Sequence, residues 1–268
     1  MRRLKRNLVI ILLVISSSLI SACGIVGNSD FDYMRQGNIM KVSIQSTRDK
    51  SYKFTVTDED VINDIYNILS SASVVEEKST LDPDYILEIY ESPTEVKTFN
   101  YVAGLDKKDG GNLYNDDNKY IVSERLDNDI IKNFANIRRP INFEYIYYTS
   151  ILKAIDKYVS ANKDSGKIGV DISSDTMALR FQISTEIEGF KKKLGKINSV
   201  SFMDDSVSRD DFNVVMSIKT EGYTSEKYKG IVTFEKTENA STVNYYINNV
   251  RDNGEWKFNI SEDKPKDF

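Results

Sequence analysis

The feature that most constrains this chain is its cysteine content. The only cysteine, Cys23, closes an N-terminal segment that reads MRRLKRNLVIILLVISSSLISAC and has the character of an export signal. Exported domains are often held together by disulfides, but a single cysteine cannot form one within the chain. The fold must therefore be stabilised by packing, and 16 Tyr, 12 Phe and one Trp supply large side chains for a core.

The N-terminal segment resembles that of a bacterial prolipoprotein. Four basic residues at positions 2–6 precede an apolar run, Leu8–Ile15, that is too short to span a membrane comfortably. Ile20-Ser21-Ala22-Cys23 then resembles the lipobox. The resemblance implies a signal peptide over residues 1–22, cleavage between Ala22 and Cys23, and a diacylglycerol on the Cys23 thiol. The open alternatives are an uncleaved helix and an ordinary signal with a chance cysteine.

A lipid anchor on Cys23 predicts a location on the extracytoplasmic face of the cell membrane, because two acyl chains hold a protein stably to a bilayer. Residues 1–22 carry four basic residues and no acidic ones, so their removal takes the formal charge from −5 to −9. An acidic mature chain argues against nucleic acid as a partner. The expected partners are the membrane, through the anchor, and a protein or other component of the cell envelope.

The chain contains no histidine. This excludes Ser–His–Asp and Cys–His catalysis and His-ligated zinc, whereas chemistry based on carboxylates or a Ser–Lys pair remains possible. We expect no cofactor and no metal site. Two acidic stretches are candidates for chemistry: the loop Asp106–Asn118 as a cation site, and the acidic pairs around Ser206–Arg209 as acid–base carboxylates. Both patterns are more typical of turns, and whether the first loop binds a cation is left open.

The hydropathy pattern predicts an α+β fold of two small domains. Residues 23–38 contain three glycines and no periodicity, which predicts a tether. Residues 39–138 predict an α+β domain with the order β-β-α-β-β-β-α, and Arg138-Arg139-Pro140 marks its end.

Residues 139–268 predict a second α+β domain, in which helices precede a C-terminal antiparallel meander. This element order resembles a cystatin-like or NTF2-like curved sheet packed on helices. Residues 168–183 predict a hairpin, with a helix as the alternative. Thr185 and Glu188 predict a capping box at the start of the next helix. Three aromatic side chains, Tyr148, Tyr245 and Trp256, are the candidate lining of a ligand pocket in the sheet concavity.

Residues 41–137 resemble a domain of YhfM-like lipoproteins of Gram-positive bacteria. The resemblance rests on Phe54-Thr-Val-Thr-Asp-Glu-Asp-Val-Ile, Asp84-Tyr-Ile-Leu, Leu113-Tyr-Asn and Tyr120-Ile-Val-Ser. It implies an extracytoplasmic lipoprotein module of unknown activity and assigns no catalytic residue.

These patterns favour a protein that binds a partner at the cell envelope over an enzyme. The alternative is a receptor lipoprotein for a small molecule. A hydrolase that uses carboxylates or a Ser–Lys pair is the third reading, and no motif supports it.

Overall fold

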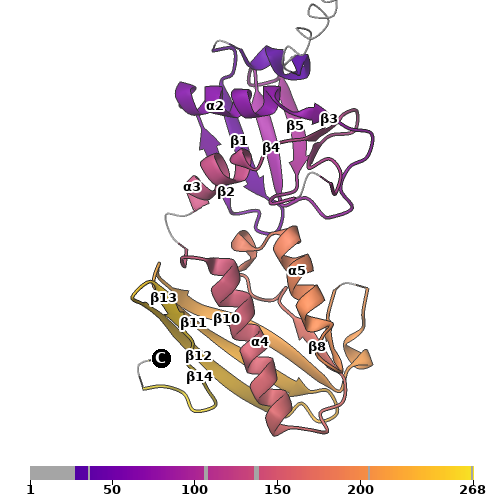
Figure 1. Cartoon of the computed structure of the whole chain (residues 1–268), viewed down its shortest axis with the longest axis vertical. Helices are drawn as coiled ribbons and strands as arrows, with labels where there is room; N and C mark the ends of the chain where they lie inside the picture. The colour runs from indigo at the N-terminus through magenta and orange to yellow at the C-terminus, as the bar shows by residue number, and fades with distance from the viewer. Residues whose placement is uncertain (1–27, 36, 106–107, 136–138, 205, 267) are drawn as a thin grey trace, which may run out of the picture.

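The computed structural model describes residues 28–35, 37–105, 108–135, 139–204, 206–266 and 268. The predicted signal peptide and Cys23 lie outside these residues. The described chain is α+β, as predicted, and forms two lobes stacked along the long axis (Figure 1). Within the described residues, no helix combines the length and the apolar character needed to cross a bilayer.

The first lobe is built on a sheet of seven strands in the order β2-β1-β4-β5-β6-β7-β3, in which every pairing is antiparallel. Three helical segments follow or interrupt the strands. The elements are β1 (Lys41–Ser46), β2 (Lys53–Val56), α2 (Glu59–Ser70), β3 (Ser73–Val74), β4 (Tyr85–Tyr90), β5 (Val96–Tyr101), β6 (Leu113–Tyr114), β7 (Lys119–Ile121), the π-helical turn η2 (Leu126–Ile131) and α3 (Lys132–Ala135).

Periodicity explains most of these elements. In β4, Tyr85, Leu87 and Ile89 alternate into the core, as period-two strands do. In α2, Ile62 and Ile65 belong to a buried stripe at helical spacing. The predicted order β-β-α-β-β-β-α is confirmed, with the two-residue strands β3 and β6 added.

The prediction of a tether up to residue 38 is wrong for residues 28–34. The 3-10 helix η1 (Ser29–Met34) belongs to the first lobe, and Phe31 and Met34 are fully buried in its core. The Phe31 ring lies 5.0 Å from that of Tyr120, whose hydroxyl donates to Asp30. Two apolar side chains among polar neighbours are too few to produce a visible period, so the composition suggested a linker.

The second lobe wraps a curled sheet around two helices. Its elements are α4 (Phe143–Ala161), β8 (Ile168–Asp171), η4 (Leu179–Phe181), α5 (Ser184–Leu194), β9 (Val200–Phe202), η5 (Arg209–Asp211), β10 (Val214–Tyr223), β11 (Lys227–Lys236), β12 (Thr242–Asp252), β13 (Glu255–Lys257) and β14 (Ile260–Ser261). Figure 1 shows α4 and α5 running over the same face of the sheet. A core of aromatic and aliphatic residues fills the space between them.

The strand order in this sheet is β13-β12-β11-β10-β8-β9, with β14 paired to β12. The predicted antiparallel meander is present in β10 to β13. The sheet as a whole is mixed, because β8 runs parallel to both of its neighbours, β10 and β9.

The predicted hairpin over residues 168–183 is wrong, and so is the helix alternative. Only Ile168–Asp171 is a strand, and the chain then leaves the sheet through turns and the short 3-10 helix η4. Asp175 explains the departure, because its buried carboxylate accepts hydrogen bonds from the backbone N–H and the hydroxyl of Thr220 on β10. This long-range bond leaves no local periodic signal.

The two lobes have separate hydrophobic cores. One contains buried residues from Phe31 to Ile131, and the other contains residues from Phe143 to Ile260. The predicted boundary at Arg138-Arg139-Pro140 falls between them, although Arg138 lies outside the described residues. The second lobe contributes Ile183 to the edge of the first core, so the lobes are in contact.

Candidate functional site

The predicted lipidation residue Cys23 and cleavage residue Ala22 lie outside the described residues. Their nearest described neighbour is Asn28, whose backbone N–H donates to the carbonyl of Ser70 at the end of α2. Five residue steps separate Cys23 from Asn28. A fully extended chain spans at most about 3.6 Å per step, so the first lobe begins within about 18 Å of Cys23.

The aromatic residues predicted to line a pocket are core residues in three different surroundings. Tyr148 on α4 packs on Phe190, and burial raises the pKa of its hydroxyl well above the ordinary value. Tyr245 on β12 donates to Glu262 at 2.9 Å. The indole N–H of Trp256 on β13 donates to the carbonyl of Ile141 at 2.9 Å. None of the three lines any of the four described pockets.

The described parts of the acidic stretches contain turns around Asn115 and Asp204. Asn115 accepts backbone N–H bonds from Asp117 and Asn118, and Asp204 accepts from both the backbone N–H and the hydroxyl of Ser206. Asp106, Lys107 and Asp205 lie outside the described residues. In the part of the chain that is described, no group of three or more acidic or thiol side chains is arranged to hold a metal ion.

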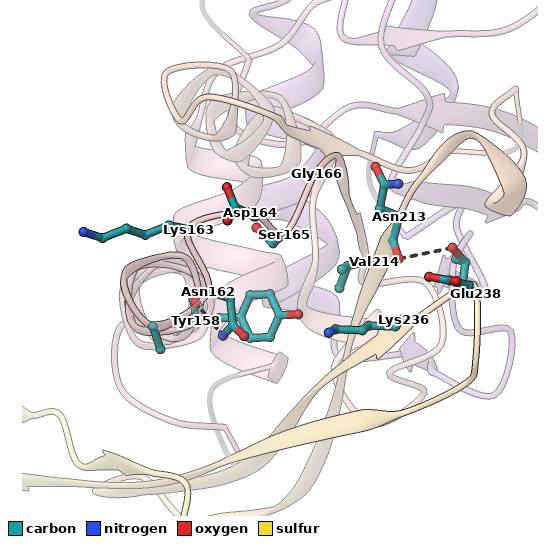
Figure 2. A pocket seen from close by; sticks show the side chains of 12 residues that line it. Tyr158, Asn162, Lys163, Asp164, Ser165, Gly166, Asn213, Val214, Lys236 and Glu238 are labelled. Carbon is teal, nitrogen blue, oxygen red and sulfur yellow. Dashed lines mark hydrogen bonds between the residues drawn. The ribbon is translucent and has the colours of Figure 1, made fainter.

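A polar pocket of about 450 Å³ is lined by residues at the C-terminal end of α4. In Figure 1 this end of α4 lies at the opposite end of the molecule from α2 and the first lobe. It is formed by the last turns of α4, the loop to β8, the start of β10 and the β11–β12 connection. Figure 2 shows the Tyr158 hydroxyl and the Lys236 side chain pointing toward one another across it, whereas Lys163 points away.

The wall of this pocket is held by one asparagine. Gly166 has a φ of +69°, and a Cβ there would meet the Asn213 side chain at 2.3 Å. The Asn213 amide oxygen accepts the Lys167 N–H, and its backbone carbonyl accepts from Thr237 on the β11–β12 connection. The α4–β8 loop, β10 and the hairpin tip are therefore tied to one another.

The Tyr158 ring is held in place by burial and by stacking on a neighbouring ring. It is almost fully buried and stacks on Phe234 with centroids 4.0 Å apart and planes 2° from parallel. Burial raises the pKa of Tyr158, so its hydroxyl is protonated at neutral pH. Sequence reasoning missed this pocket because Tyr158 reads as an ordinary core position and its other residues lie in loops distant in sequence.

A second polar arrangement joins the two lobes. Asp84 is 1% exposed, and its carboxylate accepts from Arg48 at 2.5 Å, from the Ser184 N–H at 2.7 Å and from the Ala103 N–H at 2.8 Å. Arg48 also donates to the Ser184 hydroxyl at 2.6 Å. Ser184 is the first residue of α5, so a carboxylate of the first lobe satisfies an N-terminal N–H of a helix in the second.

This arrangement corrects the predicted capping box at Thr185 and Glu188. Helix α5 starts at Ser184, so Ile183 occupies the N-cap position, two residues before the predicted Thr185, and it makes no side-chain cap bond. The Thr185 hydroxyl instead donates to the carbonyl of Ala103 in the first lobe at 3.1 Å. The cap therefore comes from Asp84, 100 positions away in sequence.

Two carboxyl groups beside this junction have raised pKa values. Burial, assisted by the nearby charge of Glu144, raises the pKa of Glu186 to about 8 against the opposing effect of Arg139. Burial also raises the pKa of Asp127 to about 6, although the Gly104 N–H donates to it. Two adjoining pockets follow the exposed side of α5, and both are lined by Thr80, Leu81 and Glu188.

Residues 35–140 match the family described as YhfM protein. The match covers the first lobe from the end of η1 and stops before α4, which agrees with the resemblance seen over residues 41–137. No curated protein and no solved structure matches the chain.

Proposed function

We propose that the protein is a lipid-anchored lipoprotein of the extracytoplasmic membrane face that binds a component of the cell envelope. The observation that carries this proposal is the short interval between Cys23 and the folded chain. With at most about 18 Å of chain available, a diacylglyceryl group on Cys23 holds the first lobe against the bilayer. The pocket at the end of α4 then faces away from the membrane.

The arrangement of the lobes supports a binding role. The lobes meet through hydrogen bonds and an ion pair, which include the Arg180–Asp49 pair at 3.1 Å and the bonds around Asp84. Such directional contacts hold one lobe at a defined orientation on the other. The first lobe thus acts as a base at the membrane, and the second presents its surface to the envelope.

The anchor is tested by replacing Cys23 with alanine and labelling growing cells with an alkyne fatty acid. We expect the wild type to be labelled and to sediment with membranes. The variant should lose the label and be released or remain unprocessed. Ser17→Ala, in the serine run before the lipobox, is the matched control and should behave as wild type. Unchanged labelling and fractionation of Cys23→Ala would rule out the lipobox.

The binding role is tested by photo-crosslinking in intact cells. A crosslinking side chain replaces Lys236 at the distal pole or Val74, which is 63% exposed on the first lobe. We expect a discrete adduct from position 236 that disappears when Cys23→Ala is added, because the anchor sets the distance from the membrane. Adducts that are diffuse, or independent of the anchor, would refute the proposed role.

A small-molecule receptor is the second candidate. The pocket at the end of α4 favours it, because its volume of about 450 Å³ is within the range of ligand sites. Native mass spectrometry of the full chain released from membranes would show a retained small ligand as a discrete mass increment, and its absence would count against a tightly bound ligand.

A further inference from the structure

We propose that the pocket at the end of α4 binds a neutral, hydroxyl-rich ligand of the saccharide class. This inference deepens the proposed binding role by naming the class of ligand, and it rests on that role for its biological setting. The pocket's own chemistry carries it.

The charges in the pocket favour a neutral ligand. Lys236 is positively charged and Asp164 and Glu238 are negatively charged, whereas Lys163 points away from the pocket, so both signs of charge surround the cavity and neither is in large excess. The C-terminal end of α4 adds partial negative charge, which disfavours an anion. Lys236 projects into the same space and disfavours a cation (Figure 2).

The hydrogen-bonding groups favour hydroxyls. The Asn162 amide nitrogen donates to the carbonyl of Tyr158, which leaves the amide oxygen available as an acceptor. Asn213 has the opposite arrangement, because its amide oxygen accepts from Lys167 and its nitrogen is left to donate. Tyr158 contributes a hydroxyl that can do both. A sugar hydroxyl both donates and accepts hydrogen bonds at one oxygen atom, so it matches such a mixed lining better than a group that can only donate or only accept.

The pocket is also preorganised. Tyr158 is fixed by stacking on Phe234, and Asn213 is fixed by bonds to two other segments. Groups whose rotamers are already set lose little entropy when a ligand binds. Among the described residues, neither Lys236 nor Glu238 takes part in an ion pair. Their charged ends are therefore available to a ligand.

The test measures binding to the full mature chain in a polyoxyethylene detergent, which carries no sugar headgroup. The probes are tetra-N-acetylchitotetraose, maltotetraose and inorganic phosphate, followed by saturation-transfer NMR and calorimetry. We expect at least one saccharide to bind saturably and phosphate not to compete. Tyr158→Phe and Lys236→Met should each weaken binding about fivefold, the effect of one lost hydrogen bond.

Lys227→Met is the matched control, because Lys227 is an exposed lysine at the opposite end of the same strand, β11. It should bind as the wild type does, and the unfolding midpoints of all variants identify any loss of fold. Saturable phosphate binding in place of saccharide, binding of neither saccharide, or equal effects of Lys236→Met and Lys227→Met would overturn the inference. Those results leave the anchor untouched, since Cys23→Ala tests it by labelling and fractionation.

Discussion

Replacing Asp84 with alanine removes a buried carboxylate that contributes to the contact between the lobes. The carboxylate is buried and accepts three hydrogen bonds, one from Arg48 and two from backbone N–H groups of Ala103 and Ser184. Hydrogen bonds to charged groups contribute about 1.5–3 kcal/mol each. Removing one partner of a buried ion pair costs about 3–5 kcal/mol, because the other charge is left unpaired.

The exposure of Arg48 decides where in that range the loss falls. Its side chain is 19% exposed, so water can solvate part of the guanidinium once the carboxylate is gone. We therefore expect Asp84→Ala to lower the free energy of unfolding by about 3 kcal/mol. Asp84→Asn keeps the shape and an acceptor oxygen, so it should lose about half as much. Asp129→Ala removes an exposed ion pair with Arg125 and should change stability by less than about 1 kcal/mol.

Urea unfolding followed by circular dichroism measures these differences, and hydrogen exchange locates them. The amides of Ala103 and Ser184 should lose protection in Asp84→Ala, whereas the amide of Val232 in the centre of β11 should keep it. A loss below about 1 kcal/mol together with unchanged protection at Ser184 would refute the role of Asp84 as a link between the lobes.

Three further changes test other parts of the structure. The pKa of Glu186 is raised to about 8 in the folded protein, so the neutral carboxyl stabilises the fold below the ordinary pKa of glutamate, and this stability is lost as the pH rises through about 8. The free energy of unfolding of the wild type should therefore fall between pH 5 and pH 9. Glu186→Gln should show a smaller fall, and equal pH dependence in the two proteins would contradict the raised pKa. Phe31→Ala should lower the free energy of unfolding of the first lobe by about 3–5 kcal/mol in urea unfolding, whereas the same substitution in a tether would leave that free energy unchanged. Gly166→Ala should cost about 1–3 kcal/mol because of its positive φ and the Asn213 side chain, and a midpoint equal to that of the wild type would show that the loop adapts.

The sequence was most informative where structure is local. The alternation in β4 and the apolar stripe of α2 identify elements that bury one face, and their order predicted the α+β class and most of the first lobe. The Asp204 and Asn115 turns also follow from short-range side-chain bonds. In each case the stabilising partner lies within a few residues, or the pattern repeats along one element.

The sequence-based predictions that were wrong have a common cause, which is a contact between residues distant in sequence. Asp175 bonds to Thr220 and ends a predicted strand, and Phe31 packs on Tyr120 within a segment that looked like a linker. The pocket at the end of α4 combines loops that are distant in sequence, so no residue spacing along the chain predicts it. A hydrogen bond or ring contact between distant positions changes local structure without altering local composition, and a single sequence contains no record of it.

The capping of α5 by Asp84 has a consequence for the order of folding. The ribosome delivers the N-terminal lobe first, and its sheet pairs only with itself. Helix α5 has no side-chain cap of its own, so its first turn is completed only when it meets a lobe that is already folded. The first lobe thereby acts as a template for the second, and a second lobe synthesised alone would leave the Ser184 N–H at the start of α5 to water instead of the Asp84 carboxylate.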